Sequence, residues 1–163
     1  MIMRSEQEAE RAVDKYADTV KRLCMIYLKN HADTEDVFQD VFLKYVLCPV
    51  VFKDPEHEKA WIIRVTVNEC KDVLKSAFRR RSVSLEDVRE LAAEETSHND
   101  VIDAVRSLPQ KYKDVVYLHY YEGYTAAEIG KILHRRENTV YTHLARAREA
   151  LRERLGDDFE RDT

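Results

Sequence analysis

The stretch Tyr124–Leu151, YTAAEIGKILHRRENTVYTHLARAREAL, decides the fold of this chain. It predicts a short helix and a longer helix separated only by residues 134–136. Two helices joined by so short a turn form a helix-turn-helix. The apolar residues available for their shared core are Ala127, Ile129, Ile132, Val140 and Leu144. The alternative is that the second helix is a basic, solvated helix in an ordinary bundle. This alternative stays open on the pattern alone, because helix pairs are common.

In a helix-turn-helix, the second helix enters the DNA major groove and its N-terminal residues meet base edges. Arginine and asparagine can pair bidentately with guanine and adenine. The candidate base readers are Arg135, Arg136, Asn138, Thr139, Tyr141, Thr142 and His143. Arg146 and Arg148 lie further along the helix, and we expect them to contact phosphates.

The rest of the chain also predicts helices, because 163 residues contain only three Gly and three Pro. Ser5-x-x-Glu8 and Thr125-x-x-Glu128 have the pattern of capping boxes. Apolar spacing predicts helices from the first box to about residue 30, and over 34–46, 56–79, 110–121, 125–133 and 137–155. Asp33 is the expected cap of the second helix, after a turn at 31–34. Gly123 suits the end of the 110–121 helix. The predicted fold class is all-α, with two small helical domains.

The net charge of −4 hides an uneven distribution of charge, with two basic segments separated by an acidic one. Residues 53–81 carry eight basic and five acidic side chains, and residues 105–156 carry ten and six. Residues 82–104, between them, carry one basic and seven acidic side chains. The predicted domains are therefore 1–81, an acidic linker 82–99, a helix-turn-helix domain 100–156 and an acidic tail 157–163.

Several classes of protein are disfavoured by the sequence. No stretch approaches the roughly 20 apolar residues of a membrane span, and the N-terminus lacks a secretory signal, so we expect a cytoplasmic chain without membrane insertion. Cys24, Cys48 and Cys70 form no CxxC and are expected to be reduced small hydrophobes. There is no phosphate loop, no HExxH and no nucleophile motif. We therefore expect no enzymatic activity, no cofactor and no metal.

The acidic residues around the second helix allow more than one interpretation. Asp33, Glu35, Asp36 and Asp40 cluster there. They could be a solvated helix start that the helix dipole favours. They could also form a carboxylate metal site with His31, although no Glu-x-x-His set accompanies them. A third interpretation, a protein-docking surface, comes from a family resemblance.

Residues 108–133, LPQKYKDVVYLHYYEGYTAAEIGKIL, and 137–155, ENTVYTHLARAREALRERL, resemble domain four of the extracytoplasmic-function class of RNA polymerase sigma factors. The matching features are Leu108-Pro109, Thr139-Val140 and Leu144-Ala145-Arg146-Ala147-Arg148. Upstream, residues 33–46, DTEDVFQDVFLKYV, resemble the family's polymerase-binding helix. Residues 52–81, FKDPEHEKAWIIRVTVNECKDVLKSAFRRR, resemble its promoter-melting helix.

The resemblance implies a sigma factor that binds core RNA polymerase and directs promoter-specific initiation. It implies polymerase contacts by Asp36, Gln39 and Asp40, with Phe38 and Phe42 in the core or in the interface. The expected contacts to the proximal promoter element are Lys53, Trp61, Arg64, Asn68, Lys71 and Lys75. The loop 47–59 would capture a flipped base, and the arginines at 79–81 are either a solvated helix end or a phosphate clamp. Trp61 can equally be a core residue.

An anti-sigma factor is a further partner that the resemblance implies, beside core RNA polymerase and promoter DNA. The chain departs from the family pattern at His134, where a glycine is usual, and at Arg136, where a small capping hydroxyl is common. We therefore expect the turn to differ locally. Two rival hypotheses are an autonomous helix-turn-helix regulator, which would bind palindromic DNA as a dimer, and a metal-dependent helical enzyme built on the acidic cluster.

Overall fold

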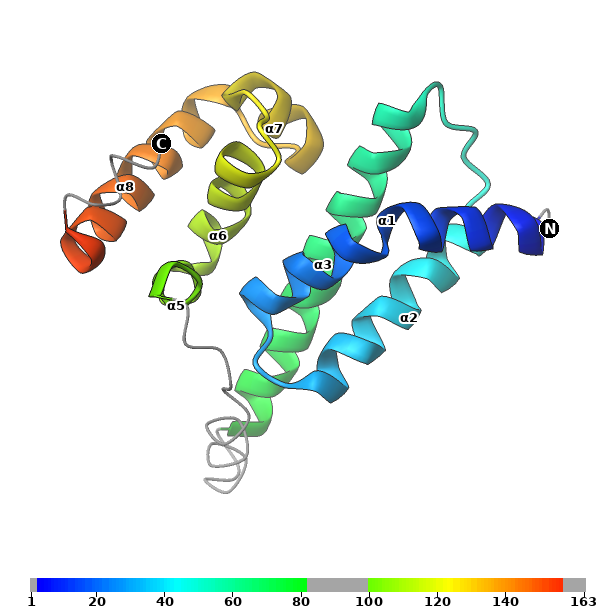
Figure 1. The fold of residues 1–163 in the computed structure, drawn as a ribbon, viewed down its shortest axis with the longest axis horizontal. Helices are drawn as coiled ribbons and strands as arrows, with labels where there is room; N and C mark the ends of the chain where they lie inside the picture. Colours follow the sequence, from blue (N-terminus) through cyan, green and yellow to red (C-terminus); the bar gives the residue numbers. More distant parts are fainter. Residues whose placement is uncertain (1–2, 82–99, 157–163) are drawn as a thin grey trace. The chain divides into compact units, whose positions relative to one another are not determined.

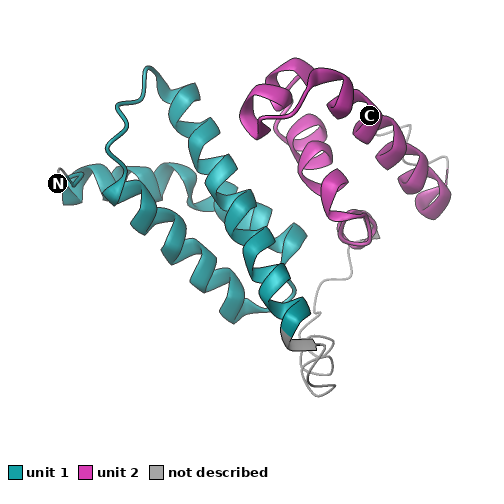
Figure 2. Ribbon diagram, turned by 180° about the vertical axis from the view of Figure 1, so that it is seen from behind, with its two compact units in different colours: residues 1–95 teal, residues 96–163 magenta. Residues whose placement is uncertain are grey.

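The computed structural model describes residues 3–81 and 100–156, and the chain divides into two compact units, residues 1–95 and 96–163 (Figure 2). Every regular element within these two ranges is helical (Figure 1), which confirms the all-α prediction. The predicted linker and tail, 82–99 and 157–163, lie outside the described residues, so the four-part division stays a prediction. Within residues 3–81 and 100–156, none of the helices combines the length and the apolar character that a membrane span needs.

The first unit is built from α1 (Glu6–Tyr27), α2 (His31–Leu47) and α3 (Pro55–Arg81), and each helix packs against the other two. Ser5 caps α1 as predicted, because its hydroxyl accepts a hydrogen bond of 3.1 Å from the Glu8 backbone N–H. Large side chains from all three helices fill the core between them: Tyr16, Val20, Leu23, Val37, Val41, Tyr45, Ile62, Ile63 and Val67.

The start of α2 differs from the prediction. Residues 31–34 are the first turn of the helix rather than a separate turn, and the cap is Asn30 instead of Asp33. The Asn30 side chain accepts from the Asp33 N–H at 2.6 Å and donates to the Asp33 carboxylate at 2.9 Å. Asn and Asp are almost equally good caps. With Asn30 as the cap, Asp33 still lies in the first turn, where the helix dipole favours a carboxylate.

Polar contacts centred on Glu58 and Glu69 join the helices of the first unit. The buried carboxylate of Glu58, in the first turn of α3, accepts from the hydroxyls of Tyr16 at 2.8 Å and Tyr45 at 3.0 Å, and lies 3.4 Å from the Arg11 guanidinium. One carboxylate therefore connects all three helices. Further along α3, Glu69 pairs with Lys44 of α2. Buried charges require such partners, since an unpaired one costs several kcal/mol.

The second unit contains α5 (Asp100–Arg106), α6 (Gln110–Val116), the π-helix η1 (Tyr117–Tyr121), α7 (Ala126–Leu133) and α8 (Glu137–Leu155). Helix α8 packs against α5, α6 and α7. Ile129, Ile132, Val140 and Leu144 are buried as predicted, but Ala127 is exposed and Ala126 takes its place. Ala126 lies three residues before Ile129 and therefore on the same helical face, whereas Ala127 lies only two residues before it.

The predicted helix 110–121 is not α-helical throughout. It widens into η1, where the Glu122 N–H donates to the Tyr117 carbonyl five residues earlier at 3.2 Å. The ring of Tyr121 stacks on that of Tyr117, with 5.3 Å between centroids. Gly123 then ends the helix with φ of +80°, in the role predicted for it.

Candidate nucleic-acid interface

The turn between α7 and α8 is closed by close backbone packing. Thr125 and Glu128 form the complete capping box that starts α7. At the end of α7, the Arg135 N–H donates to the Gly130 carbonyl at 2.9 Å. A Cβ at Gly130 would lie 2.7 Å from the Arg135 carbonyl oxygen, so only glycine fits there. Sequence reasoning missed Gly130, although an isolated glycine inside a helical pattern often marks close packing.

His134 takes the left-handed conformation, with φ of +56°, that a glycine would adopt more easily. The substitution we expected to alter the turn is therefore accommodated in the same backbone conformation. A non-glycine residue in this region costs roughly 1 kcal/mol.

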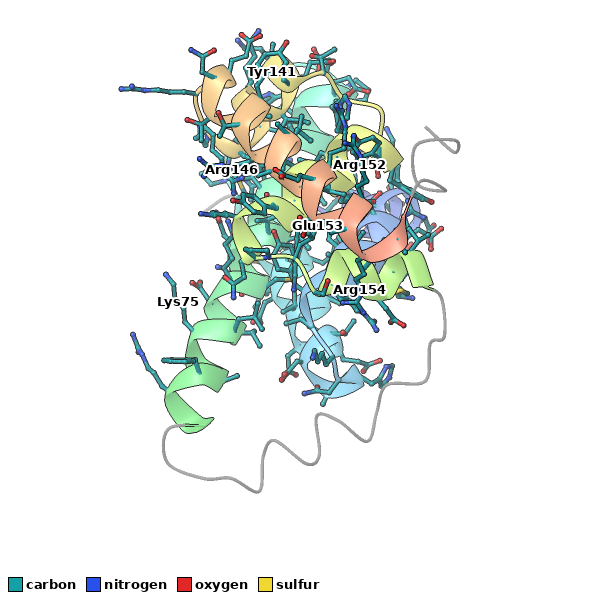
Figure 3. All side chains as sticks on the ribbon, turned by 90° about the vertical axis from the view of Figure 1, so that its left-hand side faces the viewer. Lys75, Tyr141, Arg146, Arg152, Glu153 and Arg154 are labelled. Atoms are coloured by element: carbon teal, nitrogen blue, oxygen red, sulfur yellow. The ribbon has the colours of Figure 1, made fainter. Side chains whose placement is uncertain are left out.

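The exposed and buried faces of α8 are clearly separated. Val140, Leu144, Ala147 and Leu151 are buried, whereas Asn138, Thr139, Thr142 and Arg146 are exposed. Tyr141 is 57% exposed beside them. Figure 3 shows Tyr141 and Arg146 on the N-terminal half of α8, with Arg152 and Arg154 near its C-terminal end. The outward face thus combines hydrogen-bonding groups with cations, as a major-groove surface requires.

Arg135 has a different environment from the other candidates. Its guanidinium forms two parallel hydrogen bonds with the buried carboxylate of Asp114 in α6, at 2.9 and 2.5 Å. It also donates to the Lys111 carbonyl at 3.2 Å. The guanidinium of Arg135 is thus engaged inside the domain, by a partner 21 residues away that sequence reasoning did not identify.

His143 and Arg148 are also held by neighbours. The His143 ring is half-buried and packs on Tyr112, with 5.3 Å between centroids. Burial lowers its pKa below the usual value, and the nearby Arg135 and Lys111 lower it further, so the ring is neutral at pH 7. Its Nδ1 has no hydrogen-bond partner among the described residues. The Arg148 Nε donates to the Tyr120 hydroxyl at 2.9 Å.

On the first unit, the outer face of α2 carries both acidic and apolar side chains. Asp36, Gln39 and Asp40 are exposed, as is Leu43 at 57%. Phe42 is only 8% exposed and packs against the half-buried Phe38, with 4.8 Å between ring centroids. Phe42 therefore belongs to the core. Leu43 was missed from sequence, although it follows Gln39 and Asp40 at helical spacing.

The acidic cluster does not converge on one point. No group of three or more His, Cys, Asp or Glu residues in the described part of the chain is arranged to hold a metal ion. His31 instead lies 3.2 Å from Glu35 on the same helix.

The segment 48–54, between α2 and α3, is organised by Arg4. The Arg4 guanidinium lies 4.6 Å from the Tyr45 ring centre and 5.0 Å from that of Phe52. It donates to the carbonyls of Tyr45 at 3.0 Å and Val50 at 2.5 Å. Trp61 is half-buried, with its ring centre 6.2 Å from that of Tyr45 and 5.9 Å from that of Phe52. Arg4 thus fixes the loop against an aromatic cluster, a role not visible in the sequence.

Basic and polar residues follow one face of α3. Arg64, Asn68, Lys71 and Lys75 recur every three or four residues, which places them on the same side of the helix. Asn68 and Lys75 are exposed, and Arg64 and Lys71 are half-buried. Figure 3 shows the Lys75 side chain projecting away from α3. Lys53 is exposed in the loop that precedes this helix.

Two parts of the chain match known family regions. Residues 12–82 match the family described as Sigma-70 region 2, and residues 98–151 match Sigma-70, region 4. The chain is 29% identical over 137 residues to RNA polymerase sigma factor SigV of Bacillus subtilis (strain 168), covering 82% of each chain. It is 28% identical over 179 residues to ECF RNA polymerase sigma factor SigW of the same organism, covering 96% of this chain and 94% of the relative.

Solved structures share the fold. The sigma factor RpoE in complex with the anti-sigma factor NepR, from Bartonella quintana, matches with a TM-score of 0.70 and 19% identity, covering 93% of this chain and 99% of that one. CnrH in complex with the cytosolic domain of CnrY matches with a TM-score of 0.68 and 20% identity, covering 94% of this chain and 91% of that one. With both regions present in one chain, the protein belongs to the sigma-70 family of RNA polymerase sigma factors, in its extracytoplasmic-function class.

Proposed function

We propose that this sigma factor binds core RNA polymerase through the outer face of α2 and directs it to promoters through α3 and α8. The polymerase surface would consist of Asp36, Gln39, Asp40 and the exposed Leu43. This surface carries the proposal, because it combines carboxylates with an apolar side chain that the fold leaves uncovered. Such a combination favours a basic partner surface that also offers an apolar contact. The RNA polymerase supplies the chemistry, and the family is not an enzyme class.

The N-terminal half of α8 would read the upstream promoter element. Its exposed Asn138, Thr139 and Thr142 are placed to meet base edges, with Arg136 and Tyr141 beside them. Arg146, one turn further along, would contact phosphate and add affinity without sequence information. The ring packing of His143 and the hydrogen bond of Arg148 to Tyr120 favour roles in holding α8.

The face of α3 formed by Arg64, Asn68, Lys71 and Lys75 would contact the proximal element. Lys53 and the loop that Arg4 organises would hold an unpaired base, since single strands are bound by basic tracks with aromatic or apolar platforms. Trp61 would support this loop through its ring contacts with Phe52 and Tyr45.

The regulatory partner would be an anti-sigma factor. A sigma factor of similar fold, RpoE from Bartonella quintana, is described in complex with the anti-sigma factor NepR. We extend that class of partner, and a site of action in the bacterial cytoplasm, to this chain. An autonomous helix-turn-helix regulator is not favoured, because residues 12–82 match Sigma-70 region 2 as well.

The test is a titration of the labelled chain with core RNA polymerase. The variant Asp36→Lys/Asp40→Lys should abolish tight, saturable binding. The matched control is Asp14→Lys/Asp18→Lys, which reverses two exposed carboxylates at the same spacing on α1 and should bind like the wild type. Absence of binding by the folded wild-type chain would refute the proposed function. Equal binding by both double variants would place the interface elsewhere.

A further inference from the structure

The ion pair between Asp114 and Arg135 differs from an ordinary surface salt bridge. Asp114 is fully buried, and the Arg135 side chain is only 17% exposed. Their two parallel hydrogen bonds fix the plane of the guanidinium, because the fork of arginine matches the geometry of a carboxylate. A third hydrogen bond, from Arg135 to the Lys111 carbonyl, directs the same guanidinium to the backbone of α6.

The position of Arg135 in the turn gives this pair its significance. Arg135 is the middle residue of the three that join α7 to α8, and its N–H donates to Gly130 in α7. The next residue, Arg136, is the N-cap of α8 and provides no side-chain capping hydrogen bond. The start of α8 therefore lacks the local anchor that Thr125 gives to α7. The Arg135 side chain ties this turn to α6, beside the packing of α8 itself on α6.

We infer that Asp114 and Arg135 form a positioning pair. Arg135 contacts no base. It instead fixes the N-terminal turn of α8 relative to α6, so that Asn138, Thr139 and Thr142 can contact base edges. This inference rests on the proposed DNA-reading function of α8. It also removes Arg135 from the base readers expected from sequence, since a guanidinium bound to a buried carboxylate would have to abandon that charge in order to reach a guanine.

The test uses the full chain assembled with core RNA polymerase and a pool of promoter fragments randomised over the upstream element. Bound fragments are sequenced to give the preference at each base pair. Asp114→Asn and Arg135→Met should each lower the preference for the favoured base by about tenfold at several neighbouring base pairs. The affected base pairs should be the same in both variants. Arg135→Lys, which keeps the charge but loses the fork, should give an intermediate profile. Arg154→Met is the matched control, because it removes an exposed arginine near the C-terminal end of α8 and leaves the pair intact, so it should keep the wild-type profile.

Affinity for core polymerase should stay unchanged in all these variants, because the altered residues lie in the second unit. The inference is overturned if Arg135→Met relaxes one base pair only while Asp114→Asn keeps the wild-type profile, since Arg135 would then be a base reader. If Asp114→Asn and Arg135→Met fail to fold, Arg135→Lys is the deciding variant. A wild-type base-preference profile in Arg135→Lys then overturns the inference. A wild-type complex that enriches no element refutes the proposed function itself.

Discussion

The Tyr16 hydroxyl of α1 donates a hydrogen bond of 2.8 Å to the Glu58 carboxylate of α3, and both side chains are buried. Tyr45 of α2 donates to the same carboxylate. Burial raises the pKa of Tyr16 and of Tyr45, and the hydrogen bonds to Glu58 raise both further. The folded first unit therefore keeps these phenols protonated at a pH where an unfolded chain begins to release the protons.

The first prediction is a loss of stability at alkaline pH. The contribution of these tyrosines to the free energy of unfolding is complete below the usual tyrosine pKa of about 10 and declines as the pH rises above it. Tyr16→Phe should lower the free energy of unfolding by about 2 kcal/mol at pH 7 and make its decline above pH 10 shallower. Denaturant titrations followed by fluorescence of Trp61, the single tryptophan of the chain, report on this unit. The exposed Tyr141→Phe is the control, and an unchanged slope in Tyr16→Phe would contradict the prediction.

The second prediction concerns acid and the second unit. Burial lowers the pKa of His143 in the folded chain, so an unfolded chain binds this proton first as the pH falls. The stabilisation is complete above the unfolded pKa of about 6.5 and is lost as the pH falls from there through the folded pKa. His143→Gln should therefore reduce the difference in thermal stability between pH 7.5 and pH 5, measured by tyrosine fluorescence. His134→Asn, at an exposed left-handed position that asparagine tolerates, should leave that difference unchanged.

The third prediction separates the core of α2 from its outer face. Phe42→Ala should lower the free energy of unfolding by about 3 kcal/mol or more, because it leaves a cavity in the core. Leu43→Ala should change stability by only about 0.5 kcal/mol. The affinity of Leu43→Ala for core polymerase should nevertheless fall by about tenfold, because in the proposed interface this exposed leucine would be an apolar anchor beside Asp40. Calorimetry and the polymerase titration measure the two effects. A stable Phe42→Ala with selectively weakened binding would reassign Phe42 to the interface.

The fourth prediction concerns the loop fixed by Arg4. Arg4→Ala removes the hydrogen bonds to the Tyr45 and Val50 carbonyls, so Phe52 should pack less closely on Trp61. Acrylamide should then quench Trp61 more strongly than in the wild type. Arg4→Lys keeps the charge but loses the fork, and should give a partial increase. Gln7→Ala, an exposed change in the first turn of α1, is the control. Equal quenching in all four proteins would show that Arg4 does not hold the loop.

Local patterns in the sequence predicted most of the helices. The Ser5 and Thr125 caps and the glycine at 123 place helix ends through interactions within a few residues, and the structure confirms them. Asn30 and Asp33 were harder to distinguish, because both are good caps and lie three residues apart. The π turn at Tyr117 could not be predicted, since nothing local distinguishes it from a continuing α-helix.

The site residues were predictable as a region rather than individually. Helical periodicity places Asn138 and Thr142 outward because Val140 and Leu144 face the core. The partner of Arg135 could not be found this way, because Asp114 meets it only after α6 and the turn come together. The same holds for Arg4, which contacts residues more than 40 positions away. Contacts between distant segments depend on the packing of helices, and periodicity within one helix does not specify them.

The polar contacts of Tyr45 and Lys44 with α3 restrict how α2 can move relative to that helix. Tyr45 meets Glu58 near the start of α3, and Lys44 meets Glu69 three turns later. The two contacts start from adjacent residues of α2 and end about three turns apart on α3, so they oppose rotation of one helix about the other, in addition to the buried packing between them. In the proposed complex, α2 would face the polymerase and α3 would face the promoter, so we expect the two helices to move together.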